Sequence, residues 1–290
     1  MKKIFLTTLL LNISVLVFGQ NTQGKALYLE YIDMTEAINE SNKAMDSANK
    51  NNERAAQMGA FKEQLNSFLK SLEETETELF FKDDISLYKE RQQELTAAEV
   101  NNEQNMFARW KPAHDQVYLD LEEKRRVVTK DFMGKAFLIK DDLKNYQWKV
   151  TGKQEMIAGY PSMQAIHEDT NIIIEAWFTP QIPVGIGPQG LSGLPGLITK
   201  ASYKLVVKEE NDSTPERGRM RKMMRMMQNN GGNLTVTLKE ISFEEPSKSD
   251  IKEPKKGKVV GSEEEYNKII EERVKEMQQM RGGGRGRGPR

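Results

Sequence analysis

Residues 172–198 read IIIEAWFTPQIPVGIGPQGLSGLPGLI and carry the clearest structural signal in the chain. The first part, Ile172–Phe178, is almost continuously apolar, which is typical of a strand that is covered on both faces or lies at the centre of a sheet. The second part, Thr179–Ile198, holds four prolines and five glycines. Proline withholds a backbone donor and glycine permits positive φ, so both regular helix and regular sheet are disfavoured there. We therefore predict a central strand followed by a structured loop.

The loop 179–198 contains no charged residue, whereas an exposed linker is normally polar. A backbone restricted by proline keeps apolar side chains in place, so binding through them costs little ordering entropy. The pattern predicts that the loop lines an apolar pocket or forms a docking surface. A structural interpretation stays equally open, in which the loop covers the open edge or mouth of the sheet. The candidate binding residues are Ile182, Pro183, Leu191, Leu194, Pro195, Leu197 and Ile198.

Strand-like runs continue on both sides of this loop at near-regular spacing, which is typical of a meandering antiparallel sheet. They are residues 24–31, 76–90 (a hairpin), 117–121, 125–128, 136–139, 148–151, 201–207 and 233–243. One amphipathic helix is expected at residues 53–72, where apolar side chains recur at helical spacing. Its apolar stripe is Met58, Phe61, Leu65, Phe68, Leu69 and Leu72. We predict an α+β fold: a curved antiparallel sheet with an amphipathic helix packed on it.

The N-terminus has the pattern of a secretory signal peptide. Lys2 and Lys3 precede a mostly apolar run from Ile4 to Phe18, and Gly19 offers a small residue for cleavage. The run is shorter than the roughly 20 residues needed to span a bilayer. No cysteine follows it, so attachment of a lipid there is not expected. We predict a chain exported to the periplasm, or secreted, without a transmembrane anchor in its mature form.

The composition argues against several kinds of protein and of functional site. The chain has 43 basic and 43 acidic residues, so its formal net charge of zero argues against a general nucleic-acid-binding protein. It has no cysteine, which excludes disulfides, a thiol nucleophile and cysteine-ligated metals. The predicted organisation is a signal peptide (1–19), a strand-rich domain (20–243) with a helical insertion at about 33–75, a linker (244–261), a C-terminal helix (262–280) and a disordered Gly/Arg tail (281–290).

The loop also carries a family resemblance. Residues 193–198, GLPGLI, resemble the signature of the GLPGLI family, and residues 148–150 and 157–165 resemble the stretch before that signature. Many members carry a cysteine in that stretch, where this chain has Pro161, Ser162 and Met163. The resemblance implies an exported protein of a Bacteroidetes-type envelope, in a family without an established activity. By analogy of fold, it also suggests the open half-barrel of periplasmic lipoprotein carriers, which assigns no function by itself.

The case for an enzyme rests on two histidines, His114 and His167. In a strand, His167 and Asp169 would point to one face and Glu168 to the other, so only His167 and Asp169 could cooperate in catalysis or share a metal. The favoured interpretation is a polar turn between strands. No nucleophile elbow, phosphate-binding loop or metal-binding helix motif is present in the sequence.

A methionine cluster at residues 220–227 offers thioether ligands suited to Cu(I). Met223, Met226 and Met227 are the candidate ligands, but five positive charges lie within residues 217–225 and repel a cation. A short amphipathic or mobile excursion is therefore favoured. The second interpretation is a contact of residues 217–225 with an anionic surface or partner, and the third is copper binding.

The sequence as a whole predicts a non-catalytic periplasmic binding or envelope accessory protein that engages an apolar ligand or a protein partner through the loop 179–198. Copper handling by the methionine cluster is the alternative, and an enzyme with an unrecognised site is the third. No cofactor is expected.

Overall fold

The computed structural model describes residues 22–48, 55–92, 114–170, 172–206 and 233–282. Its strands are β1 (Gln23–Ile32), β2 (Glu74–Lys82), β3 (Ile85–Glu90), β4 (Gln116–Asp120), β5 (Arg125–Phe132), β6 (Lys135–Asp142), β7 (Lys149–Ile157), β8 (Tyr160–Glu168), β9 (Ile172–Thr179), β10 (Leu197–Leu205), β11 (Asn233–Ser242) and β12 (Lys258–Val260). The helices are α1 (Thr35–Ala48), α2 (Ala55–Ser71), α5 (Glu263–Gly282) and the short 3-10 helix η3 (Pro188–Gly190).

The prediction of an α+β fold with a purely antiparallel sheet is wrong. The described part of the chain is mostly strand, and twelve strands form one mixed sheet in the order β12-β6-β5-β4-β3-β2-β1-β11-β10-β9-β8-β7. Every neighbouring pair is antiparallel except β12 and β6. That parallel pair arises because the chain crosses the sheet after β11 before it joins β6, and local sequence patterns do not report such a crossing.

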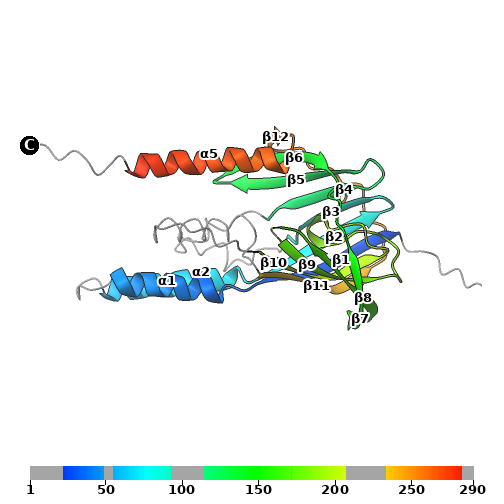
Figure 1. Ribbon diagram of the computed structural model, residues 1–290, viewed down its shortest axis with the longest axis horizontal. Coiled ribbons are helices and arrows are strands. Elements are labelled where there is room, and N and C mark those ends of the chain that lie inside the picture. The colour runs from blue at the N-terminus through cyan, green and yellow to red at the C-terminus, as the bar shows by residue number, and fades with distance from the viewer. Residues whose placement is uncertain (1–21, 49–54, 93–113, 171, 207–232, 283–290) are drawn as a thin grey trace, which may run out of the picture.

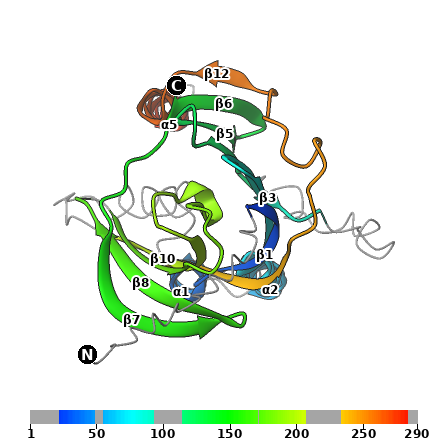
Figure 2. The same cartoon turned by 90° about the vertical axis from the view of Figure 1, so that its right-hand side faces the viewer.

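The sheet bends around the segment between β9 and β10 without closing, as Figure 2 shows. We call this segment, residues 180–196, the Gly/Pro loop. The ladder between β9 and β10 begins at the pair Thr179 and Leu197, so the loop leaves one end of the sheet and folds back into its interior. The main hydrophobic core joins sheet residues such as Phe81 and Ile139 to Ile182 and Ile186 of the loop.

The helices α1 and α2 interrupt a β-hairpin. The ladder of β1 and β2 runs on to the pair Tyr31 and Glu74, and the Ile32 amide donates to the Glu73 carbonyl at 2.8 Å. Residues 33–73 are therefore an excursion from a hairpin that is already complete, and Figure 1 shows both helices projecting beyond the sheet. We call these residues the helical arm.

The C-terminal segment, residues 244–282, passes around β6, the strand next to the edge. Residues 244–257, for which the composition predicted a linker, cross the outer face of the sheet (Figure 2). Glu245 pairs with Lys82, and Glu253 pairs with Arg125 and Lys140. The segment then adds β12 to the edge and returns along the inner face as α5.

Candidate functional site

The Gly/Pro loop was the predicted binding surface, and its apolar side chains lie in the interior. Among the seven candidate binding residues, only Pro183 and Pro195 are exposed. The buried ones are Ile182, Leu191, Leu194, Leu197 and Ile198. These side chains stabilise the fold by filling the bend of the sheet. Their contact with a ligand stays a prediction.

Four hydrogen bonds hold the loop in place. The Leu197 amide donates to the Ile182 carbonyl, and the Ile198 amide to the Ile186 carbonyl, both at 2.9 Å. The Tyr28 hydroxyl donates to the Ile198 carbonyl at 2.7 Å, and the Trp148 indole N–H donates to the Ser192 carbonyl at 2.8 Å. Carbonyl groups of the loop are thus satisfied by backbone amides of β10 and by the Trp148 indole, as a buried loop requires.

Two hollows lie on the outer surface of the described residues. The larger, of about 680 Å³, has Leu27, Phe80 and Ile241 among its lining residues, together with lysines and carboxylates. The other, of about 490 Å³, is lined mainly by acidic residues of two turns. Neither is lined by the Gly/Pro loop, so neither is the apolar pocket that a carrier using this loop would show.

The interior contains a polar cluster centred on Glu30 of β1, which is 1% exposed. The Tyr88 hydroxyl and the Gln189 side-chain amide donate to its Oε1, the latter at 2.6 Å, and His114 Nε2 lies 2.7 Å from its Oε2. The Thr77 and Tyr88 hydroxyls are hydrogen-bonded at 2.7 Å. Because Gln189 belongs to η3, this Glu30 cluster ties the Gly/Pro loop to strands β1, β2 and β3.

The ion pair of Glu30 and His114 dominates the electrostatics of this cluster. Burial by itself lowers the pKa of His114, but the hydrogen bond and the negative charge of Glu30 outweigh it and raise that pKa to about 9. His114 is therefore a cation at neutral pH and compensates the buried carboxylate. Its Nδ1 lies 3.3 Å from the Asp115 carbonyl oxygen, so both ring nitrogens have partners.

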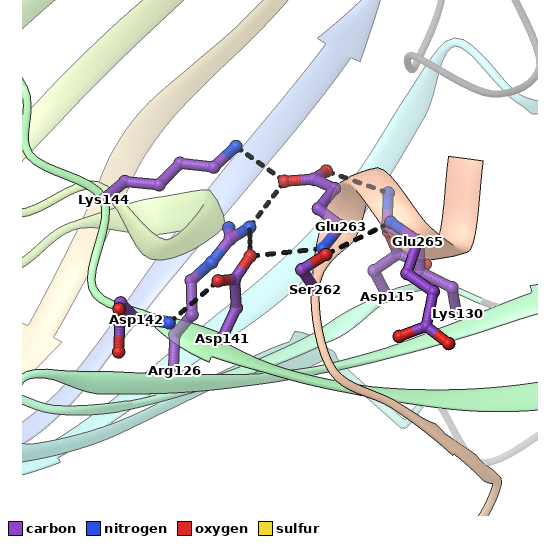
Figure 3. Close-up of polar contacts among 9 residues, drawn as sticks. All are labelled: Asp115, Arg126, Lys130, Asp141, Asp142, Lys144, Ser262, Glu263 and Glu265. Atoms are coloured by element: carbon purple, nitrogen blue, oxygen red, sulfur yellow. Dashed lines mark hydrogen bonds and ion pairs between the residues drawn. The ribbon is translucent and has the colours of Figure 1, made fainter. Parts of the chain in front are cut away.

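A second polar group, drawn in Figure 3, lies where α5 begins. The carboxylate of Glu263, the first residue of α5, accepts from Arg126 and lies 2.9 Å from Lys144 Nζ and 3.8 Å from Lys130 Nζ. Arg126 also lies 3.5 Å from Asp141, whose carboxylate accepts from the Glu263 amide at 3.2 Å. We call these residues the Glu263 network.

Three cations around one carboxylate set its charge state. Burial favours the protonated form of Glu263, but the charges of Lys144, Arg126 and Lys130 outweigh burial and lower its pKa to about 2. Arg126 is 8% exposed, and its buried Nε has no hydrogen-bond partner in the structure. The network therefore holds Glu263 as an anion at every physiological pH.

His167 lies in strand β8, so its prediction as part of a polar turn is wrong. The Gln147 amide donates to its Nδ1 at 3.1 Å, and its Nε2 lies 4.0 Å from Asp169. The rings of Tyr146 and Trp148 pack against it, with centroids 5.3 and 5.9 Å away. The strand buries His167 among aromatic rings because its side chain points inward with that of Ala165.

Several predictions fall outside the described residues: the signal peptide, the methionine cluster with Met223, Met226 and Met227, the basic segment 217–225 and residues 283–290 of the tail predicted at 281–290, whose first two residues belong to α5. Among the residues that the structure describes, no group of three or more His, Asp or Glu side chains is arranged to hold a metal ion. No helix within the described ranges is long and apolar enough to cross a bilayer.

Sequence reasoning missed Glu30, Tyr88 and Gln189. The sequence did hold one signal for Glu30. Alternation along the strand puts Glu30 on the same face as Ala26 and Tyr28. If that face is buried, the carboxylate needs hydrogen-bond or charge partners. Gln189 gave no such signal, since only the path of the Gly/Pro loop brings it to β1.

The comparisons with known proteins give a family match over part of the chain and a distant structural likeness. The model of a family described as "Protein of unknown function (Porph_ging)" matches residues 120–200, the region from the end of β4 into β10. The resemblance to a family of unknown function is thereby confirmed, and the name GLPGLI stays a prediction. No curated protein matches the chain.

Two solved structures of PNGF-II, in space groups C2 and P21, are similar with a TM-score of 0.45 and 12% sequence identity. The similarity covers 86% of this chain and 32% and 33% of those chains, so this chain spans about a third of their length. A likeness at this level supports no conclusion about fold or function.

Proposed function

We propose that this chain is a non-catalytic binding protein of the bacterial cell envelope, exported by its N-terminal signal peptide. It binds a partner at the end of the sheet from which the helical arm projects. This assignment places the contact on the helical arm and leaves the Gly/Pro loop as an internal support.

The observation that carries the proposal is the placement of the helical arm. Antiparallel pairing puts the strand ends from which the arm leaves at the same end of the sheet as the end of β3, the start of β4, the end of β10 and the start of β11. At the opposite end lie the turns 83–84 and 121–124 and two longer connections, the Gly/Pro loop and residues 243–257, which fold back onto the sheet. The helical arm instead projects beyond the sheet (Figure 1), and such projecting connections often serve function.

The helical arm supports this assignment because the sheet does not need it. Polar contacts join its two helices: Asn66 donates to Asn42 at 3.1 Å, and Lys62 pairs with Asp46 at 2.9 Å. No described residue of the arm belongs to the main hydrophobic core. An element that adds little to stability is best explained by what it contacts outside the chain.

The interior polar groups support a binding role over a catalytic one. The Glu30 carboxylate accepts from Tyr88 and Gln189 and is paired with His114, and both ring nitrogens of His114 are occupied. A general acid or base needs a free position toward its substrate. The arrangement of Glu30 and His114 therefore suits the anchoring of a loop.

Site-specific photocrosslinking in the producing bacterium tests the proposal. A photoreactive amino acid replaces the exposed Gln64 of the helical arm, and in a matched control it replaces the exposed Lys153 of β7. We expect a discrete crosslinked species from position 64 and none from position 153. Crosslinks from neither position, or only from position 153, would contradict the placement of the contact.

Export is tested in the same cells. We expect the protein in the periplasmic or secreted fraction, with Gln20 as its first residue. Recovery of the uncleaved chain from the cytoplasm would refute the envelope assignment and leave the crosslinking result to be interpreted separately.

A further inference from the structure

The C-terminal segment holds β6 from three sides. Residues 244–257 lie against the outer face, β12 pairs with the edge of β6 from Lys258 to Val260, and α5 covers the inner face. Tyr266 and Ile270 of α5 belong to the main core, where the Tyr266 ring packs on Phe137 with centroids 5.2 Å apart.

The attachments on the outer face are weak. The ion pairs formed by Glu245 and Glu253 involve lysine and arginine side chains that are all about a third exposed or more. Such exposed pairs contribute little to stability and weaken as salt is added. Residues 244–257 therefore add little that would keep the C-terminal segment in place.

The attachment at the start of α5 is less exposed and involves more charged groups. The side chain of Glu263 is 29% exposed and that of Arg126 only 9%, and three cations converge on the one carboxylate (Figure 3). Ser262 caps the helix by accepting from the Glu265 amide at 3.1 Å, and the Glu263 amide donates to Asp141. The first turn of α5 is thus fixed by charges, whereas the helix beyond Val274 leaves the core and projects past the sheet (Figure 1).

The sheet remains continuous without this segment. Strands β1 to β11 are each paired with neighbours other than β12, and the loss of β12 only turns β6 into an edge strand. Removal of α5 exposes the inner face of β5 and β6, where Val128, Phe137 and Ile139 are buried.

We propose that residues 244–282 form a clasp that opens as one unit while strands β1 to β11 stay folded, with the Glu263 network as its catch. Opening uncovers the apolar face of β5 and β6 next to the Gly/Pro loop. Because the ion pairs of residues 244–257 and of the Glu263 network add to the apolar and ladder contacts that hold the clasp, rising ionic strength weakens part of its attachment and shifts the equilibrium toward the open form.

Hydrogen exchange of the full-length protein, followed by mass spectrometry at low and high salt, tests the clasp. We expect amides of β12 and of α5 up to Ile270 to exchange together and faster than those of β1, β2 and β11, and salt to widen the difference. Glu263→Gln removes the anion of the catch and should speed this exchange roughly tenfold, the size expected for a partly buried charge contact worth ~1.4 kcal/mol.

Glu264→Gln is the matched control, because it removes the same charge from the neighbouring exposed residue of the same helical turn. It should change the exchange of α5 by less than about twofold. Equal exchange of α5 and the central strands, or equal effects of the two variants, would overturn the proposal. Global unfolding of Glu263→Gln, seen by circular dichroism, would overturn it too, since a clasp must open without the sheet.

Discussion

At the residue scale, Gly196 shows why the Gly/Pro loop has its composition. A Cβ atom at this position would lie 2.1 Å from the carbonyl oxygen of Thr179, a backbone atom that cannot move without breaking the start of the β9–β10 ladder. Gly190 meets a different restriction: it has a φ of 75°, and a Cβ there would lie 2.7 Å from Val117. The glycines let the loop approach the strands closely enough to fill the interior.

We expect Gly196→Ala to lower the free energy of unfolding by about 2–4 kcal/mol, because the clash forces the backbone of a buried loop to move. Urea unfolding followed by far-UV circular dichroism measures the change. Gly59→Ala in α2 is the control, since nothing lies within 4 Å of its added Cβ and alanine favours a helix. Similar losses in both variants would show that the close packing at Thr179 is not the cause.

His114 gives stability a dependence on pH. Its pKa is about 9 in the folded protein and about 6.5 in an unfolded chain, so the folded state binds the proton more tightly. This contribution, roughly 3 kcal/mol, is complete below about pH 6.5 and is lost as the pH rises through about 9.

The measurement is the free energy of unfolding of the wild type and of His114→Gln between pH 6 and pH 10. We expect the wild type to be more stable at the acidic end and the difference to shrink toward the alkaline end. Lysine and tyrosine titrations above pH 9 affect both proteins and cancel in the comparison. A difference that is constant over this range would rule out the ion pair with Glu30 as its source.

At the scale of elements, most strands could be predicted from the sequence. The alternation in residues 24–31 and 233–243 corresponds to β1 and β11, and the polar pair in the hairpin 76–90 is the turn between β2 and β3. Only the start of β7 was predicted, because all but the last residue of β7 is exposed and the sequence there shows no inward-facing series. Strand β8 was missed as well, although several of its residues are buried.

The helical arm is the element whose removal should matter least for folding. We expect replacement of residues 33–72 by Asn-Gly to change the free energy of unfolding by less than about 2 kcal/mol, since Ile32 and Glu73 already face each other across a complete hairpin. Calorimetry and far-UV circular dichroism of the shortened protein measure this. The same replacement of residues 180–196 removes buried core residues and should abolish folding.

If both shortened proteins failed to fold, the arm would be a structural part of the sheet. The photocrosslinking result would then need a different explanation, because the arm could no longer be treated as an element kept for its external contacts.

At the scale of the whole molecule, the interior is filled by elements that are far apart in sequence. The Gly/Pro loop follows β9, and α5 follows β12, yet both supply side chains to the core that Tyr28 and Phe81 enter from the first strands. This arrangement explains why the loop is free of charge, because charges in such a position would have to be paired or neutralised. The structural interpretation of the loop, left open by its sequence, therefore gains support.

The sequence by itself determined the strand pattern, the helix at residues 55–71 and the position of an uncharged Gly/Pro loop, because periodicity and backbone restriction are local properties. Tertiary structure alone decided that β12 joins β6, that the loop turns inward, and that Glu30 meets His114 and Gln189. These contacts bring together residues more than 80 positions apart in the chain, and no local pattern encodes which surface such residues will share.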